Sequence, residues 1–295
     1  MFMKKNSNGI ASIIFDVVNT LVLLMLAIIC LYPIYYCMVA SISDPAAQAA
    51  AGGIMLWPKG FQTLAYKSVF ANKEIFSGYM NTFFYVIVGT LINVVLSIMG
   101  AYVLSRKGLL LKRFLNLYVV FTMFVSGGMI PLYLLVKNIG LLNSRWGIIF
   151  VTAVNTYNLI MARTYFASIP ASLEESARID GAGELRILFS IMVPLCGPII
   201  AVISLYYAVG HWNSWFNEMI YLSSRTKYPI QLFLREILIL SQVSAASQDY
   251  SADKLPLSEC IKYATIVVAT LPILCIYPFA QKYFVKGVMI GAVKE

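Results

Sequence analysis

Charged side chains are scarce in this chain of 295 residues: Asp, Glu, Lys and Arg together make up 12% of it. That is about half the share usual in soluble domains. Hydrophobic residues, by contrast, account for 60%. A water-soluble fold of this length has too small an interior to bury that much apolar surface. The composition therefore excludes an ordinary soluble domain and predicts an integral membrane protein.

Side chains that carry chemistry are also few. The chain has one histidine, His211, and none of its five cysteines forms a Cys-x-x-Cys pair, so no zinc site, other metal site or disulfide framework is expected. A membrane enzyme would need several reactive groups in one cavity, so we expect no catalytic residue. No Gly-Lys dipeptide occurs, which excludes the phosphate loop that binds ATP. We predict no cofactor in this chain.

The net charge of +9 permits two interpretations. A nucleic-acid-binding protein would interleave basic and stacking aromatic residues in a polar segment, and none is evident. In a membrane protein, Lys and Arg collect in short cytoplasmic loops because they translocate poorly. The second interpretation fits the composition better.

Six apolar stretches are each long enough to cross a hydrocarbon core of about 30 Å. They are residues 17–40, 82–104, 114–136, 146–162, 190–210 and 263–280. Each is apolar on all sides rather than on one face, which is typical of a membrane span. We therefore predict an all-α integral membrane protein with six transmembrane helices.

Basic residues are dense in the N-terminal tail, in the short loop 105–113 and in the C-terminal tail. An even number of spans places all three on one side, which the positive-inside rule identifies as cytoplasmic. The first stretch is followed by a segment that resembles a signal-peptidase cleavage site. The apolar stretch 17–40 itself is longer than a signal-peptide core of about 7–15 residues and contains Pro33, so an uncleaved helix is favoured.

Ionisable residues lie at the ends of the apolar stretches rather than within them. Asp16 precedes the first, Arg163 closes the fourth and Glu218 follows the fifth. Proton-driven carriers usually place carboxylates at mid-membrane. The pattern argues against a secondary carrier, and it leaves open where the driving energy comes from.

The segment 169–183, between the fourth and fifth stretches, is the most informative part of the chain. Pro170 stops the incoming chain, and Ser172 with Glu175 fits a capping box at a helix start. Gly181 suits the left-handed residue that ends a helix, and a second helical run from Glu184 leads to Pro194. Such a segment is either a well-made loop between two spans or a short rigid helix that projects into a groove on another protein.

This segment resembles the E-A-A-x3-G-x9-I-x-L-P signature of permease subunits of bacterial ATP-binding-cassette (ABC) importers. Glu175, Ala177 and Gly181 match the signature, while Ser176 and Val193 are mild departures from it. Further matches to the sugar-importer branch are Asn81-Thr82, Ala101-Tyr102, Ser105-Arg106, Gly140-Leu141-Leu142-Asn143, Trp212-Asn213 and the tail from Gln281 to Gly291. The chain is similar to the smaller permease of the maltose type, in the group that imports oligosaccharides from complex polysaccharides.

The resemblance implies a type I importer fold in which residues 172–181 form a cytoplasmic coupling helix that contacts the ATPase. The residues expected in that contact are Glu175, Ser176, Ala177, Arg178, Asp180 and Gly181. ATP and Mg would be bound by the partner ATPase, and this chain would be a non-catalytic subunit that moves a sugar or oligosaccharide across the bacterial cytoplasmic membrane. The other implied partners are a second homologous permease, forming a heterodimer, and an extracellular sugar-binding protein.

The implied organisation has three parts. Residues 1–75 hold the N-terminal tail, the first span and an external loop; residues 76–282 form a transmembrane domain of five helices; residues 283–295 form a cytoplasmic tail. In that tail, Gly287 and Gly291 are expected to suit a strand-like or irregular segment between the ATPase subunits, the alternative being a solvated basic tail.

The external loop 222–262, with its polar stretch 241–255, is implied to face the sugar-binding protein; a plain linker is the alternative. For the sugar pathway, the candidates are polar or aromatic residues in or beside the spans: Asn93, Asn155, Tyr157, Asn158, Trp212 and Asn213. Such residues also serve as hydrogen-bonding links between helices, and that alternative stays open for each of them.

Overall fold

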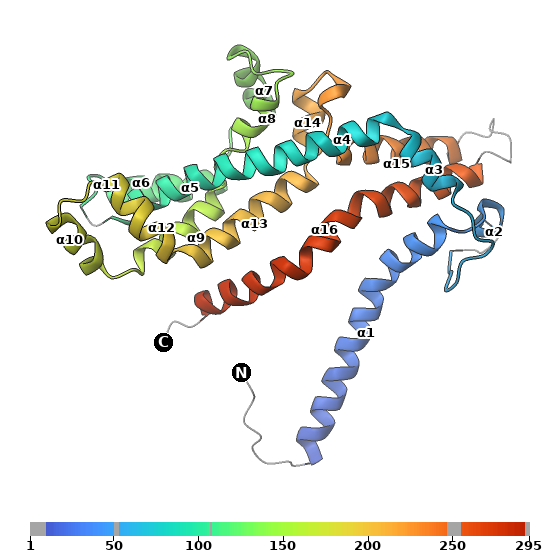
Figure 1. Cartoon of the computed structure of the whole chain (residues 1–295), viewed down its shortest axis with the longest axis horizontal. Coiled ribbons are helices and arrows are strands. Elements are labelled where there is room, and N and C mark those ends of the chain that lie inside the picture. Colours follow the sequence, from blue (N-terminus) through green and yellow to red (C-terminus); the bar gives the residue numbers. More distant parts are fainter. Residues whose placement is uncertain (1–9, 50–52, 107, 247–254, 293–295) are drawn as a thin grey trace. The chain divides into compact units, whose positions relative to one another are not determined.

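The computed structural model describes residues 10–49, 53–106, 108–246 and 255–292, and within them the chain is helical (Figure 1). The described residues contain no strand, only an isolated bridge between Ser43 and Phe61. The fold class is therefore all-α, as predicted. The chain divides into two compact units, residues 1–71 with 237–271 and residues 72–236 with 272–295.

The first unit contains α1 (Ile10–Ser41), α2 (Pro45–Ala49) and α3 (Leu64–Ala71), together with parts of α15 (Ile230–Ala246) and α16 (Leu255–Ala292). Asp44 begins α2, because its Oδ2 accepts hydrogen bonds of 3.1 Å from the N–H groups of Ala46 and Ala47. The span within α1, Ser12–Ser41, has none of its most apolar window buried. A helix so apolar and so exposed requires lipid or a partner around it.

The second unit carries the residues of functional interest. Its helices are α4 (Lys73–Phe84), α5 (Thr90–Ser105), α6 (Lys112–Phe124), α7 (Met129–Asn138), α8 (Arg145–Val151), α9 (Thr156–Ala167), α10 (Ala171–Ile179), α11 (Glu184–Arg186), α12 (Val193–Leu195), α13 (Gly197–Asn213) and α14 (Phe216–Tyr221). Two π-helical turns, η1 (Tyr85–Gly89) and η2 (Ile187–Met192), and the 3₁₀ turn η3 (Arg225–Lys227) complete it.

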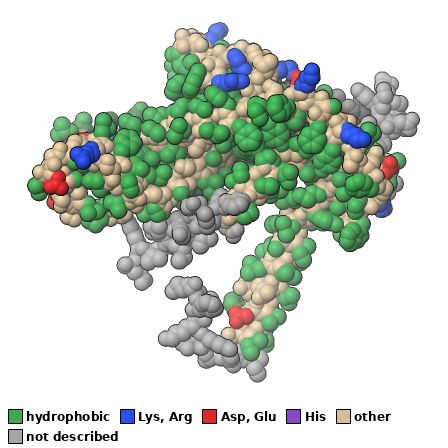
Figure 2. All heavy atoms as spheres, in the orientation of Figure 1, with side chains coloured by type: hydrophobic (Ala, Val, Ile, Leu, Met, Phe, Trp, Pro, Cys, Tyr) green, Lys and Arg blue, Asp and Glu red, His purple; other side chains and the backbone are tan. Residues whose placement is uncertain are grey.

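One apolar core joins α5, α9 and α13 in this unit, and a second includes residues of η1, α7, α8 and α14. The first lies next to α10. Ile98, Ala101, Ala162, Phe166 and Ile203 are buried at its centre, and all of them except Ile98 are wholly inaccessible. Small residues such as the two alanines let helix backbones approach closely, as is usual between helices in lipid. Outside this core, hydrophobic side chains cover most of the visible helix surfaces (Figure 2), as expected of a lipid-facing protein.

Three helices among the described residues are long and apolar enough to span a membrane: Ser12–Ser41, Lys73–Ser105 and Glu259–Ile276. The number rises to five if each of two bent helix pairs counts as one span. The predicted stretch 146–162 is divided into α8 and α9 by a break at residues 152–155. The structure thus supports a multi-span helical protein without fixing the count at six.

The two bends have identifiable causes. The pair α6–α7 bends by 111°, and Gly128 at the break has φ = 85°, a backbone conformation that favours glycine. The second bent pair consists of the helical segment Glu184–Leu195, which ends with α12, and α13, Gly197–Asn213. The two segments meet at Cys196 at a bend of 86°. Pro198 follows in the first turn of α13, where its missing N–H cannot continue the preceding helix. Apolarity predicted these stretches, but not their bends.

The prediction of an irregular C-terminal tail is wrong. The α16 helix continues to Ala292, so Gly287 and Gly291 lie within a helix. Glycine permits irregular backbone but does not require it, and its cost in a helix is only about 1 kcal/mol. The polar stretch proposed to face a binding protein falls partly in α15, which ends at Ala246; residues 247–254 lie outside the described residues.

Candidate functional site

The loop between α9 and α13 begins with a short, well-terminated helix. We call residues 168–186 the α10 loop. The N-terminal residue of α10 is Ala171, directly after Pro170, and no side-chain hydrogen bond caps the helix. The predicted capping box of Ser172 and Glu175 is therefore wrong, because Pro170 takes the N-cap position two residues earlier and places Ser172 inside the first turn.

The end of α10 is as predicted. Gly181 has φ = 80°, the N–H of Ala182 donates to the carbonyl of Ala177 at 2.9 Å, and the N–H of Gly181 donates to that of Arg178 at 3.0 Å. This pair of bonds is the Schellman motif, which satisfies the last carbonyls of a helix. A Cβ on Gly181 would meet nothing within 4 Å, so the glycine is required for its backbone angle and not for space.

The residues expected to contact an ATPase divide into two faces of α10. Glu175, Ser176, Arg178, Asp180 and Gly181 are exposed, whereas Ala177 is buried in the apolar core of the unit. Three large apolar side chains of the α10 loop are also exposed: Ile179 at 87%, Leu185 at 65% and Leu173 at 44%. Sequence reasoning did not single these three out, although an isoleucine two residues before a helix-ending glycine in a polar loop was visible.

Glu174, which sequence reasoning passed over, is the buried carboxylate of α10. It forms ion pairs with Arg106, directly after α5, and with Arg178 one helical turn away. Burial lowers the pKa of the Arg106 guanidinium, with the repulsion of Arg178 adding to the effect and the nearby carboxylate of Glu184 opposing it. Arg178, predicted to face the ATPase, thus directs its charge toward carboxylates of its own chain.

A second arrangement lies between α5, α13 and the break that separates α8 from α9. We call it the polar pocket, a cavity of about 500 Å³. It is lined by Asn93, Thr152, Asn155, Tyr157, Asn158, Tyr206, Tyr207, Gly210, His211, Ser214 and Asn217. Four of the six predicted pathway residues are among them: Asn93 from α5, and Asn155, Tyr157 and Asn158 from the start of α9. The remaining lining residues, His211 and the two tyrosines foremost, were not predicted.

Hydrogen bonds hold the walls of the polar pocket together. The side-chain amide of Asn93 donates to the carbonyl of Thr152 at 2.9 Å and lies 3.2 Å from Nε2 of His211. The Tyr207 hydroxyl lies 2.7 Å from that of Ser97 and accepts from the N–H of Asn155 at 2.9 Å. The amide oxygen of Asn93 is buried and has no partner among the described residues. A buried acceptor of this kind is available to a ligand hydroxyl or a water.

The family described as the binding-protein-dependent transport system inner membrane component matches residues 93–290. The chain belongs to this family. It is 42% identical to the polygalacturonan/rhamnogalacturonan transport system permease protein YtcP of Bacillus subtilis (strain 168), over 95% of this chain and 98% of that protein. It is 39% identical to protein LplC of the same organism, over 97% of each.

A solved structure supports the same assignment. The chain superposes with a TM-score of 0.85 and 35% identity on a chain from the crystal structure of a bacterial ABC transporter involved in the import of the acidic polysaccharide alginate, covering 95% of this chain and 100% of that one. The protein is thus a permease subunit of an ABC importer for sugars or oligosaccharides, a non-catalytic, multi-pass component of the inner membrane.

Trp212 and Asn213, the two other predicted pathway residues of this permease, do not line the polar pocket. Trp212 is buried and packs edge-on against Phe83, with ring centroids 5.8 Å apart. Asn213 is exposed, and its amide donates to the carbonyl of Val209 on its own helix. In the described structure, Trp212 therefore packs against other aromatic side chains, and Asn213 faces solvent.

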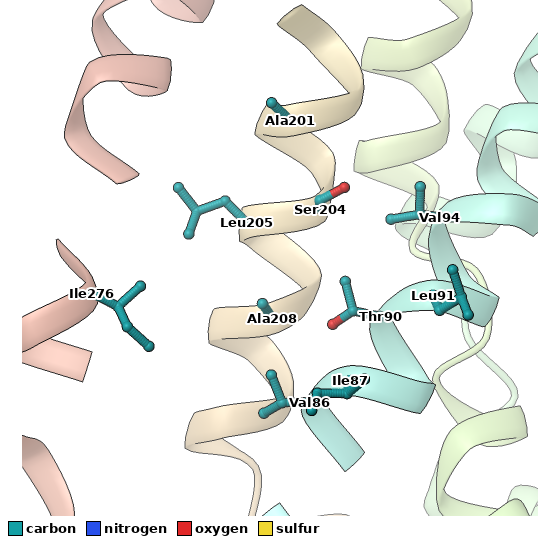
Figure 3. A pocket seen from close by; sticks show the side chains of 10 residues that line it. All are labelled: Val86, Ile87, Thr90, Leu91, Val94, Ala201, Ser204, Leu205, Ala208 and Ile276. Carbon is teal, nitrogen blue, oxygen red and sulfur yellow. The ribbon is translucent and has the colours of Figure 1, made fainter. Parts of the chain in front are cut away.

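Another cavity of the permease, of about 620 Å³, is apolar and differs from the polar pocket in character (Figure 3). Its lining is Val86, Ile87, Thr90, Leu91, Val94, Ala201, Ser204, Leu205, Ala208 and Ile276. Only Thr90 and Ser204 contribute hydroxyls, from α5 and α13 (Figure 3). Such a surface suits hydrocarbon better than a sugar.

Gly89 makes room for the histidine of the polar pocket. A Cβ at Gly89 would lie 2.5 Å from Nε2 of His211, closer than atoms pack. Gly89 ends the π-helical turn η1, and such turns often occur at functional sites. The absence of a side chain at Gly89 therefore allows the imidazole to lie in this position beside Asn93.

We expect Gly89→Ala to lower uptake by several-fold and to destabilise the permease by about 2 kcal/mol, because His211 must move and its contact with Asn93 is lost. Thermal unfolding in detergent and uptake assays measure both effects. Gly100→Ala is the matched control in the same span, Lys73–Ser105, since its Cβ would approach only the flexible end of Leu159, at 3.0 Å. Equal behaviour of the two variants would contradict the role assigned to Gly89.

Elsewhere in this unit, hydrogen bonds fix the segment that follows α14. Asn143, in the left-handed conformation with φ = 53°, accepts at its amide oxygen from the N–H groups of Ser223 and Ser224. Arg225 forms a bidentate pair with Glu74 and a further pair with Glu236. Hydrogen bonding to Glu74, followed by Glu236, raises the pKa of Arg225.

We expect Asn143→Ala to destabilise the permease by about 3 kcal/mol, since the side-chain hydrogen bonds are lost and alanine disfavours the left-handed backbone. Thermal unfolding in detergent checks this. Asn138→Ala, at the exposed end of α7, is the matched control and should shift the unfolding midpoint little. An Asn143 variant as stable as this control would show that the segment is held by other contacts.

Proposed function

We propose that the exposed face of the α10 loop is the surface on which the ATPase subunit docks. The observation that carries this proposal is the exposure of Ile179, at 87%, next to a rigid helix end. Large apolar side chains surrounded by polar ones are typical of the centre of a protein interface, and Leu185 extends the apolar area. Glu175 and Asp180, which are exposed beside them, would form the polar rim.

Docking at the α10 loop implies an orientation for the whole subunit. The loop would lie in the cytoplasm together with the basic loop 105–113 and both termini, in agreement with the positive-inside rule. The end of α16, which carries Gly287 and Gly291, would then reach the same side and supply a second contact with the ATPase. The segment after α14 and the start of α15 would face the extracellular binding protein.

We infer that the polar pocket is part of the sugar pathway. Its amide and hydroxyl groups, with the rings of Tyr157, Tyr206 and Tyr207, are the groups that bind sugar hydroxyls and pyranose faces. The lining residues include no Lys, Arg, Asp or Glu. The substrate would be an oligosaccharide, in keeping with the polygalacturonan/rhamnogalacturonan and alginate systems named among the relatives, and its acidity would be recognised outside this pocket.

Reconstitution tests this function directly. The permease is assembled with a second permease, the ATPase subunits and the binding protein in proteoliposomes, and oligosaccharide uptake is followed with and without ATP. Uptake should require ATP and the binding protein and should be indifferent to a proton gradient. Accumulation by vesicles that carry this chain alone, driven by a proton gradient, would contradict the proposal.

A further inference from the structure

Five side chains form a closed ring behind the exposed face of α10; we call it the α10 ring. Its members are Tyr102, Arg106, Glu174, Arg178 and Glu184. Arg106 pairs with Glu174, and Arg178 bridges Glu174 and Glu184 at 2.7 Å each. The Tyr102 hydroxyl donates to Glu184 at 2.6 Å, and the Arg106 guanidinium lies 4.6 Å from the centre of the Tyr102 ring, which closes the circuit.

The members come from three elements that are separate in the chain. Tyr102 belongs to α5 and Arg106 follows directly after it; Glu174 and Arg178 belong to α10; Glu184 begins α11. The ring therefore joins the short helix both to the span that ends at Ser105 and to the bent span that begins at Glu184. Through the ring, α10 is connected by side-chain contacts to two spans.

The ring is well placed to carry force because little else supports α10 on that side. A cavity of about 460 Å³ lies beside it, and its lining includes Tyr102, Arg106, Glu174, Arg178 and Glu184 as well as Leu109 and Phe166. Within α10, only Ala177 belongs to the buried apolar core. A helix over a cavity has few packing contacts through which to transmit motion, so the paired charges are its stiff connection.

Arg106 is itself held in place. Its guanidinium donates to the Ser105 hydroxyl at 2.8 Å, and Lys112 donates to the Ser105 carbonyl at 3.1 Å. The side chains of Arg106 and Glu174 are only 18% and 12% exposed, so solvent screens their pairing far less than that of a surface pair. An ion pair that is held in place and shielded from water can transmit a displacement, whereas a solvated pair would separate and exchange its partner for water.

We propose that the α10 ring transmits the movement of the docked ATPase to the two spans, with Arg106 and Glu174 as the positioning residues. This rests on the proposed docking of the ATPase on the exposed face of α10 and deepens it. Docking and transmission are thereby assigned to different faces of one helix: the exposed face that carries Ile179 docks, and the face that carries the buried Glu174 transmits. Loss of the ring should leave an assembled complex that hydrolyses ATP with little transport.

The test uses the complete reconstituted transporter and three quantities: ATPase retained on purification, ATP hydrolysis, and sugar moved per ATP hydrolysed. Arg106→Gln and Glu174→Gln should each retain the ATPase and lower sugar moved per ATP about tenfold. Because both residues act through one connection, the double variant should be no worse than either single one. Arg106→Lys keeps the charge and should recover most of the coupling.

The exposed-face variant Ile179→Asp separates this inference from the proposed docking. It should reduce the retained ATPase while the complexes that do form keep a normal ratio of sugar to ATP. If the Arg106 and Glu174 variants instead lose the ATPase in proportion to uptake, the ring is only a structural support for docking and the inference fails. An unchanged ratio in both variants would also overturn it. Retention of the ATPase by Ile179→Asp would count against the docking surface alone.

Discussion

Gly181→Val is expected to abolish ATP-driven uptake almost completely and to reduce the amount of ATPase that co-purifies with the permease at least tenfold. Gly181 holds φ = 80°, which a β-branched residue adopts only with strong strain. The substitution should break the two hydrogen bonds that end α10 and displace Ile179 from its exposed position. The docking surface would then lose its shape while the membrane spans remain intact.

Gly183→Val supplies the control two residues away. Gly183 has φ = −73° and ψ = 161°, which valine adopts readily, and a Cβ there meets nothing within 4 Å. This variant should insert, retain the ATPase and transport nearly normally. Co-purification measured on detergent-solubilised complexes distinguishes the two. If both variants retain the ATPase equally, the α10 loop is not the docking surface.

Asn93→Leu is expected to lower the rate of uptake more than tenfold while the ATPase remains bound. Leucine branches at the same carbon as asparagine, so it is the apolar side chain nearest to it in shape. The substitution removes the amide that joins Thr152 to His211 and the buried oxygen that has no partner among the described residues. A sugar passing this point would lose hydrogen-bonding partners, and the groups left unpaired would add a cost of about 1–3 kcal/mol.

Asn213→Leu is the matched control, because Asn213 is exposed and bonds only to the carbonyl of Val209 among the described residues. Uptake, retained ATPase and the unfolding midpoint should all be measured on both variants, so that a loss of stability is not taken for a loss of transport. Normal uptake by a stable Asn93→Leu permease would exclude Asn93 from the pathway.

The membrane class of this protein could be predicted from the sequence because apolarity is a property of each stretch alone. The helices of α1, of α4 through α5 and of α16 cover the predicted stretches 17–40, 82–104 and 263–280. The bends at Gly128 and Cys196 could not be predicted in the same way, since the length of an apolar run does not show whether the helix that it forms is continuous. Proline and glycine were present at both places, but α1 also contains Pro33 and continues through it.

The α10 loop shows how far local rules extend. Gly181 was assigned correctly, because a left-handed helix end depends on one residue and its neighbours. The capping box failed although its residues were present, because Pro170 decided where the helix begins. Arg178 was assigned outward from its position in the motif, whereas its charge pairs with Glu174 and Glu184.

The sequence by itself determined that the chain is a helical membrane protein, which stretches are apolar, and which short segment carries the importer signature. All of these follow from composition or from residues within a few positions of one another. Only the tertiary structure decided that Asn93 and His211 share a pocket and that Arg106 meets Glu174. The members of each pair are separated by many residues in the chain. The packing of α5 against α9 and α13 brings such residues together, and that packing cannot be deduced from the sequence around either residue alone.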